Sequence, residues 1–271
     1  MNSSLKLIHP IRYYKEYLKQ KVRPDGRGVS SFRPVSLNIN SITTADGSAV
    51  IKIGKTNVIC AIKAELTAPK PETPKEGLVC VSVELPPLCS SKFRPGPPSD
   101  EAQVATSFMN QLLKESNLLD LESLCIQVDK LVWVLYCDII CLNHDGSLLD
   151  ACVPVLIAAL KTLTLPSVTY DTTTEDISVD TNSRHKVPVN HSLTAITHAV
   201  FQENLVADPS SDEENICEGT LTVVCEEEKL QCIHKPGGIP ISEEQIRQCI
   251  KNGLERSKSL KELISTVCAS S

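Results

Sequence analysis

The stretch from Leu131 to Leu160, LVWVLYCDIICLNHDGSLLDACVPVLIAAL, constrains the fold more than any other part of the chain. Every residue from Leu131 to Leu142 is apolar except Asp138, a pattern typical of a strand buried on both faces. The next four residues, Asn-His-Asp-Gly at 143–146, predict a tight turn. A carboxylate inside such a strand needs a hydrogen-bond partner or a place at the sheet edge, and the sequence leaves both open for Asp138.

An apolar helix is predicted directly after this turn, over residues 151–160. With Asp150 or Ala151 as N-cap, Pro154 falls in the first turn, where backbone amides have few helical partners. A strand, a tight turn and a helix N-terminus present free N–H groups that can bind a small anion. The sequence therefore predicts a potential anion site here, and the neighbouring side chains decide whether it is used.

Composition describes an ordinary globular protein. The 271 residues, 41% of them hydrophobic, suffice for one large core or two modest ones. No apolar run reaches the ~18 residues of a membrane span, and the first 24 residues mix charges with aromatics, unlike a signal peptide. We therefore expect an intracellular protein. The net charge of -6 disfavours a free-standing nucleic-acid binder, which usually has a basic face.

The 12 cysteines indicate neither a disulfide framework nor a zinc site. Most lie within apolar strand or helix patterns, and no Cys-x-x-Cys pair occurs. We expect reduced, largely buried thiols, no metal and no cofactor.

The rest of the chain alternates groups of strands with helices, which predicts an α+β fold with mixed sheets and packed helices. Ser99 is the predicted N-cap of the second helix, and Ser242 with Gln245 forms a capping box for the last. The mostly polar segment from Leu165 to His191 contains the predicted boundary between two halves. The predicted helices are 11–21, 100–114 and 243–264. The predicted strands are 35–39, 49–53, 58–64, 78–85, 193–201, 204–207, 220–224 and 230–234, with 168–170 and 177–179 as two further short candidates. The strands 49–53 and 58–64 flank Gly-Lys-Thr-Asn at 54–57, which predicts a hairpin.

Four segments together resemble the RNase PH family: RPDGR at 23–27, the stretch 45–65, ELPPLCSSKFRPGPP at 84–98 and CDIICLNHDGSLLDA at 137–151. Within that family the chain is most similar to ring subunits of the eukaryotic RNA exosome. The resemblance covers nearly the whole chain and implies the ribosomal S5 domain 2-like fold. It divides the chain into an N-terminal helix and extension (1–30), a first RNase PH-like domain (31–167) and a second (190–271).

The resemblance also implies where a phosphate-dependent 3′-to-5′ exoribonuclease would hold its phosphate, and this chain departs from the pattern there. The family's arginine before Glu-x-Gln corresponds to Pro98, although Glu101-Ala102-Gln103 itself is present. Its Thr-Arg pair after the Asp-Gly turn corresponds to Leu148 and Leu149. Each charge-assisted hydrogen bond contributes about 1.5–3 kcal/mol, so losing two or three weakens phosphate binding roughly a thousandfold or more. These positions are therefore interpreted as a degenerate phosphate site.

The family's pair of metal-binding aspartates is altered as well. Glu214 takes the first position, and Thr220 or, in a shifted alignment, Glu218 takes the second. We interpret Glu214 and Thr220 as a degenerate metal site.

Other polar residues near the turn have simple structural interpretations. We expect Asp145 to form the turn, Asp150 to cap the helix and His144 to be a surface or turn histidine. Lys92 and Arg94, in the stiff proline-rich loop, are the candidate RNA contacts, with an ordinary solvated loop as the alternative.

The resemblance leads to one expected function and two alternatives. We expect a catalytically inactive ring subunit that supports 3′-to-5′ RNA processing and degradation by scaffolding and RNA threading. Its expected partners are the other RNase PH-like subunits, RNA-binding cap subunits and single-stranded RNA, in the cytoplasm and in the nucleus including the nucleolus. The alternatives are a phosphate-dependent exoribonuclease and an RNA-binding module outside the ring.

Overall fold

The computed structural model describes residues 6, 8–171, 176–201, 204–227 and 229–269. The fold is α+β, as predicted, with two main sheets and a projecting two-stranded ribbon. The larger sheet has the strand order β1-β2-β3-β6-β4, with β5 paired to β6, and only β4 runs parallel to its neighbour β6. Its strands are β1 (Val35–Ile39), β2 (Gly47–Ile53), β3 (Thr56–Thr67), β4 (Leu78–Glu84), β5 (Cys125–Gln127) and β6 (Leu131–Asn143).

The predicted hairpin between β2 and β3 is confirmed, with Ile53 opposite Thr56 and Gly54 and Lys55 between them. Gly54 adopts φ +57°, a left-handed value that glycine reaches at little cost and that suits a tight hairpin turn.

The prediction that β6 is buried on both faces is wrong for its second half. Leu131 through Leu135 are buried, but Tyr136 and Asp138 are exposed on a sheet face that no described helix covers. Asp138 therefore meets water and needs no internal partner. In this half of β6, buried residues alternate with residues on the open face. The sequence does not show the alternation, because two residues of the open face, Ile140 and Leu142, are apolar.

Helix α4 (Leu148–Thr162) lies at the centre of the molecule, packed on β2 and β3 on one side and on strand β9 (Leu193–Phe201) on the other. It begins earlier than predicted, since its N-cap is Ser147, whose side chain makes no capping bond. Pro154 consequently lies inside the helix and not in its first turn. The missing amide is tolerated because the helix is fixed by apolar packing on both sides.

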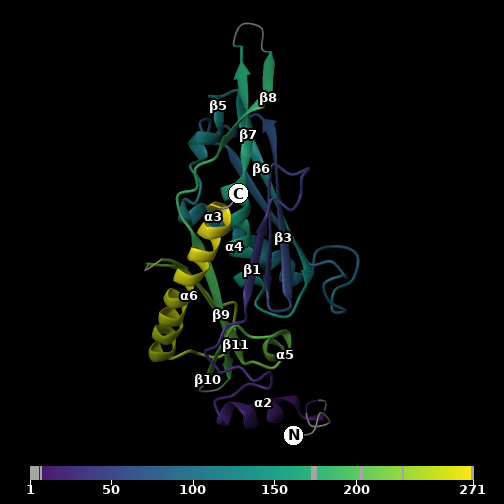
Figure 1. Ribbon diagram of the computed structural model, residues 1–271, viewed down its shortest axis with the longest axis vertical. Helices are drawn as coiled ribbons and strands as arrows, with labels where there is room; N and C mark the ends of the chain where they lie inside the picture. The colour runs from purple at the N-terminus through teal and green to yellow at the C-terminus, as the bar shows by residue number, and fades with distance from the viewer. Residues whose placement is uncertain (1–5, 7, 172–175, 202–203, 228, 270–271) are drawn as a thin grey trace.

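The second sheet has the order β10-β9-β11-β12, built from β9, β10 (Asn204–Ala207), β11 (Gly219–Glu226) and β12 (Lys229–His234). The long helix α6 (Glu243–Ala269) packs on β9 and β11 (Figure 1). Its predicted capping box is confirmed: the Ser242 hydroxyl accepts from Gln245 N, and the Gln245 side chain accepts from Ser242 N.

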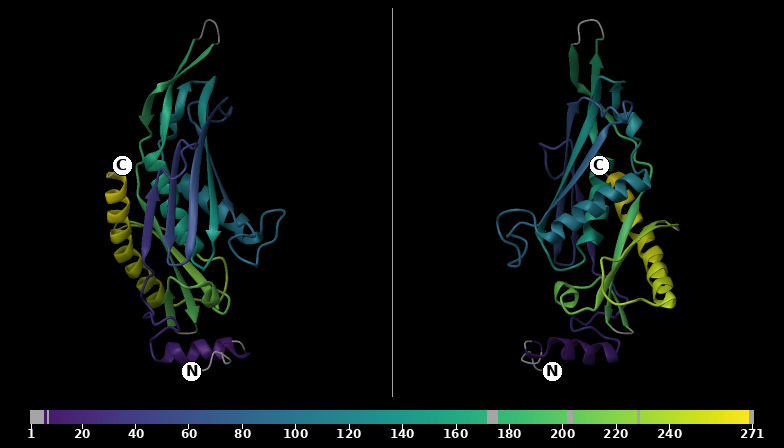
Figure 2. Two further views of the ribbon diagram at one scale, coloured as in Figure 1. Left: turned by 45° about the vertical axis from the view of Figure 1, so that its right-hand side comes forward. Right: turned by 180° about the vertical axis from the view of Figure 1, so that it is seen from behind.

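Helix α3 (Asp100–Ser116) packs against β4, and its predicted cap is confirmed because the Ser99 hydroxyl accepts from Ala102 N. The two ends of the molecule carry less packed elements (Figures 1 and 2). Helix α2 (Pro10–Lys19) lies at one end, and at the other the ribbon of β7 (Thr164–Tyr170) and β8 (Ile177–Lys186) projects from the larger sheet. The two short strands predicted at 168–170 and 177–179 are confirmed as parts of this ribbon, which lies mostly within the polar segment 165–191.

All 12 cysteines are free thiols, and most are buried, as predicted. Cys80, on the outer face of β4, is the exposed exception. Within the described ranges, no helix is both long and apolar enough to cross a membrane.

Candidate functional site

The turn between β6 and α4 lies against the segment that follows β10 in the second sheet. Gly146 adopts φ +79°, and a Cβ added there would come within 2.5 Å of the Pro209 carbonyl oxygen. The Ser147 hydroxyl also joins the turn to this segment, since it donates to the Pro209 carbonyl oxygen at 3.0 Å. The Asp-Gly turn thus holds the start of α4 against the loop that leads into the short helix α5 (Ser211–Glu214).

The amide at the start of α4 is already paired with a carboxylate of the protein. Ser147 N donates to Glu214 Oε1 at 2.7 Å. Burial raises the pKa of Glu214 to about 7, more than the Ser147 bond lowers it, and the nearby Glu101 carboxylate adds to the rise. The predicted anion position is therefore filled by a side chain of this protein.

A cavity of about 380 Å³ opens beside this contact. Leu148 and Leu149, in the first turn of α4, contribute apolar wall, while α3, α5, β11 and the segment after β12 contribute the remaining sides. The lining residues are Lys92, Asp100, Glu101, Val104, Ala105, His144, Leu148, Leu149, Thr197, Glu214, Asn215, Thr220, Thr222, His234 and Pro236.

The structure brings together most of the site positions predicted from sequence. Leu148, Leu149, Glu214, Thr220 and Lys92 all line the cavity.

Three other positions lie apart from the cavity wall. Pro98 is exposed, and its carbonyl accepts from Gln103 Nε2 at 3.0 Å. Arg94 is exposed in the same loop, and Glu218 is exposed before β11. The position matching the family's arginine therefore offers neither charge nor cavity surface.

Lys92 lies at the edge of the cavity with its ammonium group engaged. Nζ donates to Asn215 Oδ1 at 2.6 Å and reaches Ser211 Oγ at 3.5 Å. Its assignment to RNA binding stays a prediction, as does that of Arg94.

His144 lies in the turn, as one of its two interpretations predicted, but it is not a surface histidine, because only 2% of its side chain is exposed. Phe93 packs edge-on against it with ring centroids 5.8 Å apart. Nε2 lies 3.1 Å from Glu101 Oε1, but within the described residues neither ring nitrogen has a partner in hydrogen-bond geometry. The adjacent His144 ring lowers the pKa of the Glu101 carboxyl. Sequence reasoning missed this residue because a turn histidine is usually exposed, and its burial depends on Phe93, distant in the chain.

The prediction that Asp150 caps α4 is also wrong. Asp150 lies in the first turn and reaches across to β9, where it accepts from Thr197 N at 2.9 Å and Thr197 Oγ1 at 2.6 Å. Burial raises the pKa of Asp150 to about 8. At neutral pH this carboxyl is largely protonated and joins α4 to the second sheet.

Beyond the cavity, α5 takes part in a buried network of charged side chains. Arg23 is fully buried and pairs bidentately with Glu213, while also donating to the carbonyls of Ala207 and Asp208. Arg33 donates to the Asp208 carboxylate through its backbone amide, Nε and a terminal nitrogen. The Arg33 guanidinium lowers the pKa of Asp208 despite its burial. This network ties residues 23–33 to the second sheet.

The arrangement gives no obvious place for a metal ion. Within the described part of the chain, no group of three or more His, Cys, Asp or Glu side chains is arranged to hold one. Of the two positions matched to the family's metal ligands, only Glu214 carries a carboxylate, and Thr220 offers a hydroxyl.

Comparison with known proteins places this fold in a family. Residues 31–166 match domain 1 of the 3′ exoribonuclease family, RNase_PH, and residues 191–256 match domain 2. The chain is 43% identical over 257 residues to the exosome complex component rrp43 of Schizosaccharomyces pombe, covering 94% of each chain. It is 33% identical to the exosome complex component Rrp42 of Pyrococcus furiosus, covering 93% of this chain and 91% of that one.

A solved structure shows the same architecture. A chain of the Archaeoglobus fulgidus exosome, determined with RNA bound to the active site, superposes with a TM-score of 0.83 at 30% identity, covering 93% of this chain and 96% of that chain. The protein therefore belongs to the 3′ exoribonuclease, or RNase PH, family.

Proposed function

We propose that this protein is a ring subunit of the RNA exosome. The proposal is supported by end-to-end similarity to proteins named exosome components and to a subunit of a solved exosome. Other RNase PH-like subunits are then its neighbours, with RNA-binding cap subunits above the ring and single-stranded RNA passing through it. We further propose that it works in the cytoplasm and in the nucleus including the nucleolus.

The subunit is proposed to be catalytically inactive. The observation that carries this is the start of α4, where the Ser147 amide is paired with Glu214 and the next two residues are leucines facing the cavity. A phosphate entering here must displace a carboxylate and lose its hydration without gaining a cationic partner from α4. Each missing charge-assisted bond removes about 1.5–3 kcal/mol of binding.

An RNA degradation assay tests the inactivity. The purified chain is incubated with 5′-labelled single-stranded RNA and either inorganic phosphate or water as acceptor. We expect no shortening of the RNA and no release of nucleoside diphosphates. Phosphate-dependent release that persists across independent preparations and disappears in Glu214→Gln would establish the alternative, a phosphorolytic exoribonuclease.

Assembly tests the ring role separately. Purification through a tag on this chain, followed by mass spectrometry of the intact complex, is expected to recover the other ring subunits. A subunit removed from its ring exposes interface surface, so the isolated chain should self-associate and become monodisperse on co-expression with its neighbours. A thermally stable monomer that ignores those neighbours would contradict the ring role.

A further inference from the structure

The wall of the cavity carries more acidic than basic side chains. Three carboxyl side chains line it, from Asp100, Glu101 and Glu214, against the single ammonium of Lys92. That ammonium already donates to Asn215. At pH 8, above the pKa of about 7 of Glu214, the carboxylates outnumber the single ammonium of the wall. Such a wall repels a phosphate and attracts a cation.

The hydrogen-bonding groups of the wall point to the same class of ligand. Carboxylates are acceptors, and a neutral imidazole keeps one nitrogen as an acceptor. His144 is a buried polar group of the same wall: its ring lines the cavity and its side chain is 2% exposed. Nε2 lies 3.1 Å from Glu101 Oε1 without hydrogen-bond geometry, and Nδ1 has no hydrogen-bond partner in the described part of the chain. A buried imidazole in this state is completed by a ligand that donates. Ammonium and guanidinium groups donate several hydrogen bonds and accept none.

The apolar part of the wall indicates that the ligand also has a hydrocarbon part. Leu148, Leu149 and Val104 lie beside the carboxylates, so an occupant that places charge on Glu101 and Glu214 must also cover hydrocarbon. A bare metal ion covers no apolar surface. An alkyl chain ending in a cation does, as lysine and arginine side chains do elsewhere. The volume, about 380 Å³, lies at the small end of ligand pockets.

We propose that this cavity binds an organic cation, an alkylammonium or alkylguanidinium group whose stem packs on Leu148 and Leu149 while its head meets Glu101, Glu214 and His144. The cation is either a free amine or a lysine or arginine side chain of a neighbouring protein. The inference rests on the proposed function in one respect only, that the cavity does not serve phosphate chemistry.

Methyl NMR of the chain, leucine-labelled and prepared with its ring neighbours, tests the binding at pH 8. Assembly is verified first by size-exclusion chromatography, so a failure of the ring role is seen before any ligand is added. Titration with n-butylguanidinium should shift the Leu148 and Leu149 methyl resonances saturably. Butyl phosphate and n-butanol, at matched ionic strength, should not. Glu101→Gln combined with Glu214→Gln should weaken the guanidinium binding at least tenfold.

The source of the cation is separated by comparing the smallest monodisperse assembly with the complete ring. Shifts in both preparations indicate a free amine as the natural occupant. Shifts in the small assembly that vanish in the complete ring indicate a protein side chain inserted by a neighbour. Absence of shifts in the small assembly, or shifts with butyl phosphate in place of the cation, overturns the proposal.

A tethered cation provides a second test that needs no added ligand. Leu149→Arg places a guanidinium inside the cavity, and we expect its melting temperature at pH 8 to exceed that of the matched Leu149→Met variant by about 2–4 °C. Adding Glu214→Gln should remove this gain. A Leu149→Arg chain that melts at or below the Leu149→Met temperature contradicts the proposal, whatever the outcome for assembly or RNA degradation.

Discussion

Glu213 and Glu214 are adjacent in α5, yet their carboxylates lie in two regions that balance charge differently. Glu213 is buried against Arg23, with side chains 3% and 0% exposed, and both of its oxygens accept from that guanidinium. Glu214 faces the cavity, accepts one backbone amide bond and has a pKa raised to about 7. The Glu213 carboxylate therefore stabilises the fold, whereas burial disfavours the charged form of Glu214.

The difference shows which charged residues can be replaced at little cost to the stability of the fold. In the buried network each charge is balanced by another residue of the same chain, so replacing one leaves the other uncompensated. In a ligand site part of the balance comes from the ligand. Without a ligand, protein charges that face the cavity are an electrostatic cost, whereas apolar side chains in its wall, such as Leu148 and Leu149, carry no such cost. The charges of Asp208 and Arg33 are therefore balanced within the fold, whereas Glu214 at the cavity accepts a single backbone amide bond.

Removing the charge of Glu213 should have the largest effect. Glu213→Gln leaves the Arg23 guanidinium buried without a counter-ion, so we expect the free energy of unfolding to fall by about 3–5 kcal/mol. Urea unfolding of the chain in its soluble assembly measures this. Asp212→Asn is the matched control, because Asp212 is 58% exposed and pairs with the exposed Lys6. The control should change stability by less than about 0.5 kcal/mol. Similar losses in both variants would mean that the buried pair is not the anchor.

Removing the charge of Glu214 should stabilise the chain, with a pH dependence of known sign. The folded-state pKa, about 7, lies above the ordinary value of 4.5, so between these values the folded state binds more protons than the unfolded state. This group therefore costs the wild type stability as pH rises from about 4.5 to 7. Glu214→Gln should match the wild type near pH 4.5 and be more stable above pH 7, by up to roughly 3 kcal/mol.

The difference between variant and wild type is the quantity to follow, because Asp150 and His198 also titrate with shifted pKa values, about 8 and about 4. Both are common to the two proteins and cancel. Glu84→Gln, at an exposed position of β4, controls for the chemical change and should show no such trend. A Glu214→Gln difference that stays flat from pH 4.5 to 8 would place this carboxylate with the buried network.

The smallest effect is expected at the edge of the cavity. Reversing two charges, Lys92→Glu with Arg94→Glu, should leave assembly intact and weaken single-stranded RNA binding by the complete ring a few-fold, most at low salt, because such contacts act on phosphates without reading sequence. Fluorescence anisotropy over a salt series measures this.

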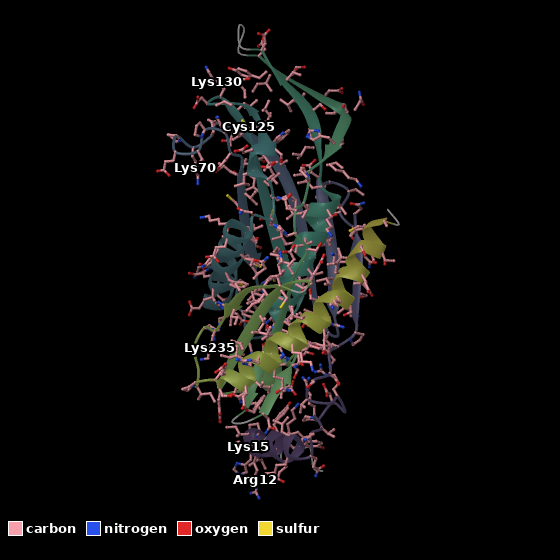
Figure 3. All side chains as sticks on the ribbon, turned by 90° about the vertical axis from the view of Figure 1, so that its left-hand side faces the viewer. Arg12, Lys15, Lys70, Cys125, Lys130 and Lys235 are labelled. Atoms are coloured by element: carbon pink, nitrogen blue, oxygen red, sulfur yellow. The ribbon has the colours of Figure 1, made fainter. Side chains whose placement is uncertain are left out.

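Lys70→Glu with Lys75→Glu provides the matched control for that experiment. It makes the same charge change in the exposed loop before β4. Figure 3 shows Lys70 far along the molecule from Lys235, which precedes the cavity-lining residue Pro236. Equal losses in both double variants would indicate a general effect of net charge, and no loss in either would make the Lys92 loop an ordinary solvated segment.

Much of the fold was determined by local sequence. The hairpin at Gly54, the cap at Ser99 and the capping box at Ser242 were predicted correctly because each depends on residues within a few positions of one another. The sequence likewise shows that Leu148 and Leu149 carry no charge, since chemical type alone excludes a charge-assisted phosphate contact from their side chains. Sequence could also bring Glu214 and Thr220 into one site, though only through family resemblance.

Tertiary structure alone decided which polar groups are buried and what they contact. Asp138 lies in an apolar run yet faces water, because no described helix covers that side of the sheet. His144 lies in a turn yet is buried, because Phe93 packs on it from another loop. Asp150 sits at a helix start yet bonds to Thr197 on the opposite sheet. In each case the deciding partner is distant in the chain, and burial, which sets the cost of a charge, is a property of the packed molecule and of no single segment.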